Sequence, residues 1–175
     1  MNHGVSDPPT GAAAARDAHH AVAEFDDARN WLEARRKSMP PLYAESWVFD
    51  RECRHVLLVQ HRWRGWVPPG GKVEACETPR EAARRELWEE TGVRVRLEPA
   101  PAAVCVRSYR ADWSATLGLS YSAITDTDLP LTGEVGQPAA WIPLHEEWWS
   151  VFPEDRDRIR CHAQYLARSP NATAP

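Results

Sequence analysis

The segment GKVEACETPREAARRELWEETGV, Gly71 through Val93, is the most informative stretch of this chain. It places a glycine, an isolated glutamate, an arginine and three clustered glutamates at fixed intervals. The order is Gly71, five residues, Glu77, seven residues, Arg85-Glu86-Leu87, one residue, Glu89-Glu90, one residue, and Gly92-Val93. The same short segment therefore carries both a candidate helix and the acidic side chains of a candidate site.

The second half of this segment predicts a helix from Pro79 to about Thr91. Thr78 is a favourable N-cap, proline suits the first helical position, and Glu81 completes a capping box. Gly92 supplies the C-terminal stop. Residues three and four apart are neighbours on a helix surface, so three carboxylates should project from one side. These are the carboxylates of Glu86, Glu89 and Glu90.

Three like charges on one helical face repel one another and destabilise an isolated helix. A hard divalent cation such as Mg²⁺ relieves the repulsion, because it prefers carboxylate oxygens and keeps waters that substrate phosphates can replace. For three glutamates alone, an ordinary solvated helix is the usual interpretation. The complete spacing from Gly71 to Val93 favours a metal-binding phosphate site instead.

The residues before the helix are consistent with such a site. The loop WVPPGG, Trp66 to Gly71, follows the strand-like run 56–59. Its two prolines fix the approach of the chain, and its two glycines allow backbone geometry that larger side chains would block. A loop of this kind is a strand-to-helix turn, and it can also bring a backbone carbonyl up to a metal ion.

The segment matches the Nudix box at every specified position, and the chain resembles the Nudix hydrolases there. The resemblance implies that Glu90 is the central metal ligand, that Glu89 is a second ligand, and that the carbonyl of Gly70 is another. It implies that Glu86 is either a further ligand or the base that deprotonates the attacking water. The metal would be Mg²⁺, with Mn²⁺ as a possible substitute.

The resemblance also assigns the remaining box residues. Arg85 orients the carboxylates through charge-assisted bonds, with Glu77 as its partner. Leu87 and Val93 are packing residues. The expected catalytic residues are Glu86, Glu89 and Arg85. The implied reaction is water attack on phosphorus in the diphosphate linkage of a nucleotide derivative, with metal ions neutralising phosphate oxygens.

Residues outside the box indicate the substrate only weakly. Gly136-Gln137-Pro138, followed by Trp141, resembles the corresponding segment of MutT-type nucleoside triphosphate pyrophosphohydrolases. In that group a glutamate just upstream helps to bind metal; Glu134 is the nearest one here, offset by one residue. A MutT-like activity is therefore favoured. Hydrolysis of ADP-ribose, a nucleotide sugar or a diadenosine polyphosphate is the alternative, and so is a nucleotide-sensing domain without catalysis.

Three further residues are candidates for substrate contact. Trp66 lies at the edge of the glycine loop, where it would contact a base or sugar or else pack under the loop. Arg62 precedes the loop and would meet phosphate or remain solvated. Tyr109 lies sixteen residues after Val93, where diadenosine polyphosphate hydrolases tend to place a tyrosine.

Composition agrees with a small enzyme of one domain, since 175 residues can bury a sizeable core. The formal net charge of −4 indicates no broad cationic surface, so a nucleic-acid polymer is not expected as a partner. Four widely spaced cysteines without a CxxC pair are typical of reduced thiols, and the chain shows no signal peptide or membrane-length apolar run. We therefore expect a cytoplasmic monomer or homodimer that binds small nucleotides and no membrane.

The expected organisation has four parts. Residues 1–10 form a disordered tail, 11–40 a helical extension, 41–168 the Nudix hydrolase domain, and 169–175 a second disordered tail. In the extension, apolar residues at helical spacing predict one amphipathic helix over 11–37; they are Val22, Phe25, Ala28 and Leu32. The extension would pack on the domain, support a dimer or cover the site.

Strand-like runs fill most of the remainder. They are Tyr43–Phe49, His55–Gln60, Val93–Leu97, Ala102–Tyr109, Ala115–Ile124 and Ala139–Ile142. The run Ile159–Leu166 predicts a closing helix. The interleaved helices and strands indicate an α/β fold, and short hairpin-like neighbours argue against a fully parallel sheet. The resemblance makes this specific: an α/β/α sandwich around a mixed β-sheet, with an N-terminal helical extension.

Overall fold

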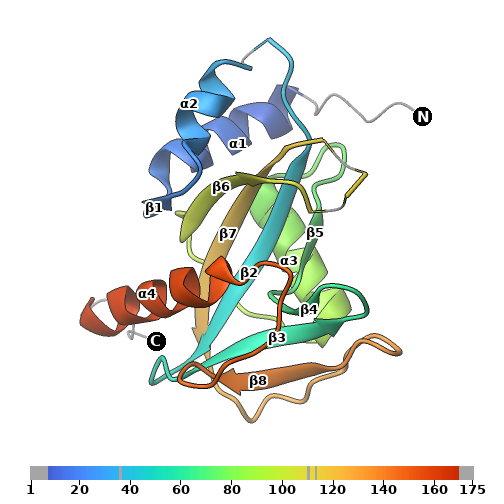
Figure 1. The fold of residues 1–175 in the computed structure, drawn as a ribbon, viewed down its shortest axis with the longest axis vertical. Coiled ribbons are helices and arrows are strands. Elements are labelled where there is room, and N and C mark those ends of the chain that lie inside the picture. Colours follow the sequence, from blue (N-terminus) through green and yellow to red (C-terminus); the bar gives the residue numbers. More distant parts are fainter. Residues whose placement is uncertain (1–7, 36, 110, 113, 170–175) are drawn as a thin grey trace.

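The computed structural model describes residues 8–35, 37–109, 111–112 and 114–169 (Figure 1). In chain order the elements are α1 (Pro8–His20), β1 (Ala23–Glu24), α2 (Ala28–Glu33), β2 (Leu42–Asp50), β3 (His55–His61), β4 (Gly65–Val67), β5 (Gly70–Lys72), α3 (Pro79–Thr91), β6 (Ala103–Arg107), β7 (Thr116–Thr125), β8 (Ala139–Pro143) and α4 (Glu154–Arg168). None of the described helices combines the length and apolar character that a membrane span requires.

The strands form one mixed sheet in the order β1-β6-β7-β2-β3-β4. Strand β5 pairs with β2, and β8 pairs with β3. The central pair β2–β7 is parallel over its whole length, from Leu42 opposite Leu117 to Asp50 opposite Thr125. The pair β1–β6 is also parallel, whereas the other pairs are antiparallel. The predicted mixed sheet is confirmed.

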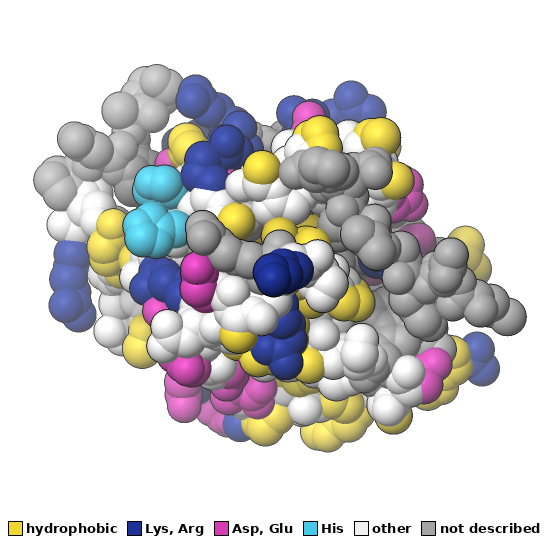
Figure 2. Space-filling model, turned by 90° about the horizontal axis from the view of Figure 1, so that it is seen from above, with side chains coloured by type: hydrophobic (Ala, Val, Ile, Leu, Met, Phe, Trp, Pro, Cys, Tyr) yellow, Lys and Arg dark blue, Asp and Glu magenta, His cyan; other side chains and the backbone are white. Residues whose placement is uncertain are grey.

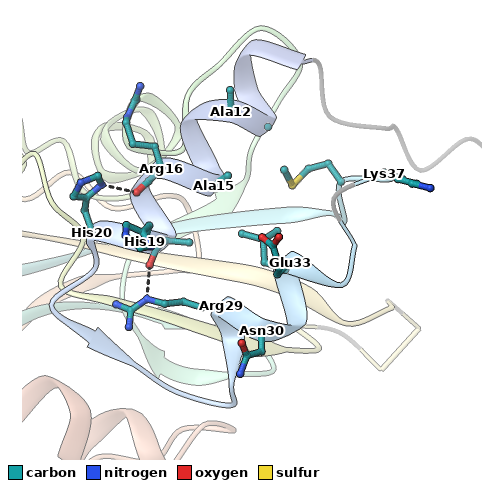
Figure 3. A pocket seen from close by; sticks show the side chains of 13 residues that line it. Ala12, Ala15, Arg16, His19, His20, Arg29, Asn30, Glu33 and Lys37 are labelled. Carbon is teal, nitrogen blue, oxygen red and sulfur yellow. Dashed lines mark hydrogen bonds between the residues drawn. The ribbon is translucent and has the colours of Figure 1, made fainter.

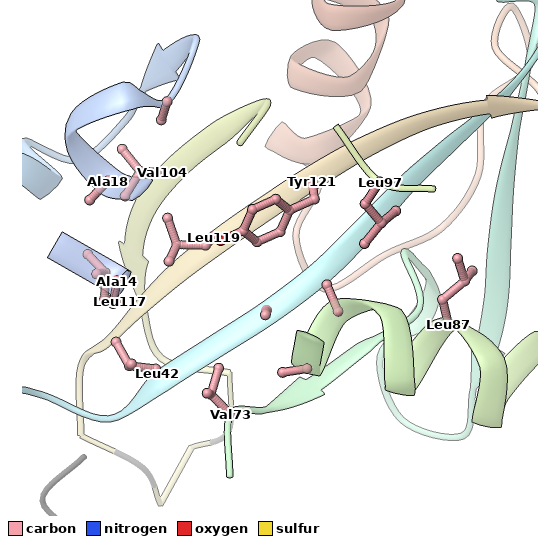
Figure 4. Close-up of a cluster of buried hydrophobic side chains, with 14 of the residues drawn as sticks. Ala14, Ala18, Leu42, Val73, Leu87, Leu97, Val104, Leu117, Leu119 and Tyr121 are labelled. Carbon is pink, nitrogen blue, oxygen red and sulfur yellow. The ribbon is translucent and has the colours of Figure 1, made fainter. Parts of the chain in front are cut away.

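Alternation along β2 divides the core into two layers, because successive strand residues point to opposite faces. Leu42, Ala44 and Val48 belong to a cluster with residues of α1 and α3 (Figure 4). Trp47 and Phe49 belong to a second cluster with residues of α4. Helices α3 and α4 therefore cover opposite faces of the sheet (Figure 1), which is the predicted α/β/α sandwich.

The N-terminal extension differs from the single helix that was predicted. The backbone N–H groups of Val22, Ala23 and Phe25 bond to carbonyls of residues 101–104, so this stretch adds strand β1 to the edge of the sheet. The apolar spacing of 22–32 therefore does not mark one continuous helix. The buried stripe of α1 consists instead of small residues, among them Ala14 and Ala18.

Arg29 ties the parts of this extension together (Figure 3). Its Nε donates to the carbonyl of Ala18 at 3.0 Å, and its Nη2 donates to the carbonyl of Ala21 at 2.9 Å. Its Nη1 bonds to Glu24 at 2.7 Å. The end of the molecule that carries α1 and α2 mixes basic, acidic and apolar side chains (Figure 2).

Two other expectations change. Residues 93–98 form no strand in the described chain; Val93 and Leu97 are buried in the core, which produces the strand-like alternation without strand pairing. Helix α1 starts at Pro8, so residues 8–10 are helical rather than part of a tail. The remaining tail residues, 1–7 and 170–175, lie outside the described residues.

Candidate active site

Helix α3 carries the acidic side chains, and its ends are fixed as the sequence predicts. The Thr78 hydroxyl accepts from the backbone N–H of Glu81, and the Glu81 carboxylate accepts from the backbone N–H of Thr78 at 2.8 Å. Gly92 ends the helix, its N–H bonded to the carbonyl of Trp88. A fully buried Leu87 anchors the inner face of the helix. The fixed ends of α3 and its buried Leu87 thus hold Glu86, Glu89 and Glu90 at fixed positions on the other side of the helix.

Arg85 binds three carboxylates at once. Its Nε and Nη2 donate to the two oxygens of Glu77 at 2.9 and 3.0 Å. Its Nη1 donates to Glu86 at 2.6 Å and to Glu89 at 3.2 Å. A fork of this geometry suits carboxylates and holds them with charge-assisted bonds. The expected pairing of Arg85 with Glu77 is therefore present.

Glu90 contacts the glycine loop directly. Its Oε2 accepts the backbone N–H of Gly70 at 2.8 Å. Burial raises the pKa of Glu90 to about 7, although the Gly70 N–H acts in the opposite direction. The negative charges of Glu86 and Glu134 contribute to the same rise in pKa. The Glu90 carboxylate is thus partly desolvated and lies near other negatively charged side chains.

Both glycines of the loop make approaches that a side chain would prevent. A Cβ on Gly71 would lie 2.1 Å from Oε1 of Glu86. A Cβ on Gly70 would lie 2.5 Å from Cβ of Glu45 on the neighbouring strand β2. Glycine at position 70 therefore lets the loop pack against the backbone of β2, and glycine at position 71 leaves room for the Glu86 carboxylate beside the loop.

The Gly70 carbonyl has a partner that the sequence alone does not reveal. The Tyr43 hydroxyl donates to this carbonyl oxygen at 2.6 Å. Burial raises the pKa of Tyr43, so its hydroxyl stays protonated and remains a donor. Arg64 donates in turn to the Tyr43 oxygen at 3.2 Å, and its positive charge lowers the pKa of the nearby Glu90. The sequence does not indicate this role of Tyr43, because its contact with Gly70 depends on the pairing of β2 with β5.

The donor set fits a hard divalent cation. Among the described residues, no three His, Cys, Asp or Glu side chains converge as a metal-binding group, and Arg85 holds Glu86 and Glu89 of the clustered glutamates. Burial nevertheless raises the pKa values of both Glu86 and Glu90, which means that their charged forms lack sufficient compensation. A divalent cation bound by carboxylate and carbonyl oxygens would supply that compensation.

The candidate substrate residues fall into three places. Arg62 and Trp66 line one pocket of about 480 Å³ at the β3–β4 hairpin. Glu134 is exposed and accepts a hydrogen bond from the side-chain amide of Gln137 at 2.8 Å. Its negative charge raises the pKa of Glu90. Tyr109 is 5% exposed and stacks on Tyr43, with ring centroids 3.8 Å apart. Because the Tyr109 side chain is buried, the structure does not support the predicted contact between Tyr109 and the substrate.

The family follows from a direct match. The family model of the NUDIX domain matches residues 39–164, so the chain belongs to the Nudix family. Members of this family act on phosphoanhydride bonds of nucleotide derivatives and generally use divalent metal ions.

Individual relatives match over shorter stretches. The putative 8-oxo-dGTP diphosphatase YtkD of Bacillus subtilis (strain 168) is 52% identical over 50 residues, which cover 29% of this chain and 32% of that protein. The MutT-like protein of Streptomyces ambofaciens is 42% identical over 62 residues, covering 34% of this chain and 40% of that protein. These matches span well under half the length of either relative.

Solved structures support the fold. A NUDIX family hydrolase from Clostridium perfringens superposes with a TM-score of 0.59 at 18% identity, covering 71% of this chain and 97% of that one. The MutT NUDIX hydrolase from Burkholderia pseudomallei gives a TM-score of 0.57 at 19% identity, covering 70% and 97%. At this identity the likeness shows the architecture alone.

Proposed function

We propose that this enzyme is a Mg²⁺-dependent, MutT-like pyrophosphohydrolase that converts a nucleoside triphosphate into its monophosphate and pyrophosphate. The observation that carries the proposal is the Glu90 carboxylate, bonded to the Gly70 N–H and surrounded by the acids Glu86 and Glu134. The partial matches to a MutT-like protein and to a putative 8-oxo-dGTP diphosphatase favour a triphosphate over other nucleotide derivatives.

In this mechanism Glu86, Glu89, Glu90 and the Gly70 carbonyl would hold the metal. When bound, Mg²⁺ would neutralise phosphate oxygens and lower the pKa of a coordinated water. Arg85 keeps two of these carboxylates in place through the bonds described above. Glu86, whose pKa is raised by burial, is also suited to accept a proton from the attacking water. That water adds to phosphorus as the bridging oxygen leaves with the pyrophosphate.

The substrate proposal is tested by a panel assay in Mg²⁺ with nucleoside triphosphates, oxidised nucleotides, ADP-ribose, nucleotide sugars and diadenosine polyphosphates. We expect the highest kcat/KM for a triphosphate, with release of pyrophosphate rather than phosphate. A higher kcat/KM for ADP-ribose or a diadenosine polyphosphate would replace the proposed substrate. Nucleotide binding without turnover anywhere in the panel would favour a sensing role.

Replacing Tyr43 by Phe is expected to weaken metal binding about ten- to a hundredfold, because the Gly70 carbonyl loses the donor that orients it. Binding of Mn²⁺ measured by electron paramagnetic resonance on the purified variant checks this without reference to turnover. Tyr165→Phe is the matched control, since Tyr165 is an exposed tyrosine on α4. Equal Mn²⁺ affinity in both variants would remove Tyr43 from the support of the loop.

Replacing Trp66 by Ala is expected to raise KM for the preferred nucleotide roughly two- to tenfold while the Mg²⁺ activation curve stays unchanged. An indole that stacks on a base contributes about this much. Trp66 shares its pocket with Arg62, and none of the clustered glutamates of α3 is among the described residues that line it. Steady-state kinetics at several Mg²⁺ concentrations separates the two effects. Trp63→Ala provides the comparison, because Trp63 is 71% exposed on the same hairpin; an unchanged KM for Trp66→Ala argues against base contact.

A further inference from the structure

A groove of about 1320 Å³ runs along the flank of α3, bounded by α1 and by residues 94–99. Arginines from these three segments converge on it: Arg16, Arg80, Arg84, Arg85, Arg94 and Arg96. Three acidic side chains of the described residues line the same groove, namely Asp17, Glu77 and Glu81. The groove therefore carries an excess of positive charge on a protein whose formal net charge is −4.

The acidic side chains of the groove are already engaged with the protein. Glu77 is bonded to Arg85, and Glu81 is held in the capping box of α3. Asp17 accepts a hydrogen bond from the hydroxyl of Tyr121 at 2.5 Å. These three carboxylates offset part of the charge of the six arginines, for example Glu81 beside Arg80 and Arg84, and the groove keeps an excess of positive charge.

Several of the arginines have unused donors. Arg80, Arg84 and Arg96 are exposed, and none of them forms a hydrogen bond or ion pair with another described residue. The Arg16 side chain is 66% exposed, and its Nε lies 3.6 Å from the carboxylate of Asp17. A guanidinium group presents a planar fork of donors that matches phosphate oxygens. The groove thus offers several phosphate-binding groups along one line.

An aromatic surface lies in the same groove. Trp88 follows Arg80 and Arg84 at successive intervals of four residues, so the three side chains form one row along α3. Trp88 is 44% exposed, and the guanidinium of Arg94 lies 4.0 Å from the centroid of its ring. Exposed indoles flanked by arginine are suited to stacking unpaired bases.

We propose that this groove binds single-stranded nucleic acid, with phosphates on the arginines and a base stacked on Trp88. A duplex keeps its bases stacked inside and would not use the indole; inorganic polyphosphate has no base to place there. The net charge, which led us to expect no polymeric partner, averages over the surface and hides this convergence. Arg85 and Glu77 border both the groove and the glutamate cluster, so a bound strand would lie beside the candidate active site.

The test is fluorescence anisotropy with a labelled oligouridylate of about ten nucleotides that carries a 5′-hydroxyl and so presents no phosphoanhydride. Arg80→Gln/Arg84→Gln is expected to lower the salt dependence, the slope of log K against log salt, by about 0.7 for each phosphate that the variant no longer binds. Trp88→Ala is expected to weaken binding about tenfold. Neither variant should change nucleoside triphosphate hydrolysis, so this result is independent of the proposed function.

The matched control variants remove the same number of positive charges, or one aromatic ring, at positions outside the groove. Arg54→Gln/Arg168→Gln removes the same two charges away from the groove, and Tyr165→Ala removes an equally exposed aromatic ring from α4. Weaker binding by the groove variants alone supports the proposal. It is overturned if the control variants bind as poorly, if the wild-type protein does not bind the oligonucleotide, or if inorganic polyphosphate binds as tightly and Trp88→Ala has no effect.

Discussion

A Glu90→Gln variant is expected to lose about a hundred- to a thousandfold in Mg²⁺-dependent kcat while it keeps its fold. Loss of a charged ligand weakens stabilisation that is worth several kcal/mol in the transition state. The amide has the same volume, and its oxygen can still accept the Gly70 N–H that Glu90 accepts at 2.8 Å. Single-turnover rates across a Mg²⁺ titration, together with circular dichroism, measure both parts.

Glu90→Gln is also expected to change how the free energy of unfolding of the metal-free protein depends on pH. Because the pKa of Glu90 is raised from 4.5 to about 7, the folded state binds more protons than the unfolded state between these values. The free energy of unfolding should therefore fall as pH rises from 4.5 to 7, by on the order of 2–3 kcal/mol for this group. Glu90→Gln should remove that decline.

The control for Glu90 is Glu52→Gln, which neutralises an exposed carboxylate distant from the loop. It should leave both kcat and the pH profile of unfolding unchanged. Full activity of Glu90→Gln would refute its assignment as a ligand. Identical pH profiles for wild-type and Glu90→Gln protein would show that the carboxylate is not desolvated.

The largest expected effect on stability lies on the other face of the sheet, at a buried ion pair. Arg107 donates to both carboxylate oxygens of Asp155 at 2.8 and 2.7 Å, and their side chains are only 10% and 4% exposed. Asp155→Asn removes the carboxylate that binds the guanidinium through two hydrogen bonds and leaves it beside the half-exposed Glu154 at 3.8 Å, so we expect a loss of about 3–5 kcal/mol in the free energy of unfolding. This is a large share of the roughly 5–15 kcal/mol that stabilises a typical domain.

Urea unfolding measures this loss, with Asp126→Asn as the comparison. Asp126 pairs with Arg51 at the surface, where solvent screens the interaction, so its removal should have little effect. The double variant Arg107→Met/Asp155→Leu should regain part of this stability, because it removes both charges of the pair while Glu45 and Arg158 stay beside the site. If Asp155→Asn were as stable as Asp126→Asn, the pair would not be the desolvated contact that its burial indicates.

The parts predicted well from sequence are those fixed by local chemistry. The ends of α3 depend on Thr78, Glu81 and Gly92, which act within one or two turns of the helix. The pairing of Arg85 with Glu77 also lies within the box segment. Strands β2, β3, β6, β7 and β8 are recognisable because their own residues alternate or are strongly apolar.

The parts that sequence does not reveal depend on segments distant in the chain. Tyr43 reaches the Gly70 carbonyl only because β2 pairs with β5, and nothing in either segment alone indicates this contact. Residues 93–97 alternate like a strand, but burial in the core rather than strand pairing produces that pattern. The arginine groove likewise arises from three separated segments, which a total charge cannot reveal.

Strand β1 has one more consequence, for the design of shorter versions of the protein. It occupies the outer side of β6, since Ala23 and Glu24 pair in parallel with Ala103 and Val104. A chain trimmed to the start of the family match at residue 39 would leave that side of β6 with unsatisfied amide and carbonyl groups. An uncovered border of this kind can pair with strands of other molecules, so we expect the trimmed chain to self-associate more readily than the full chain.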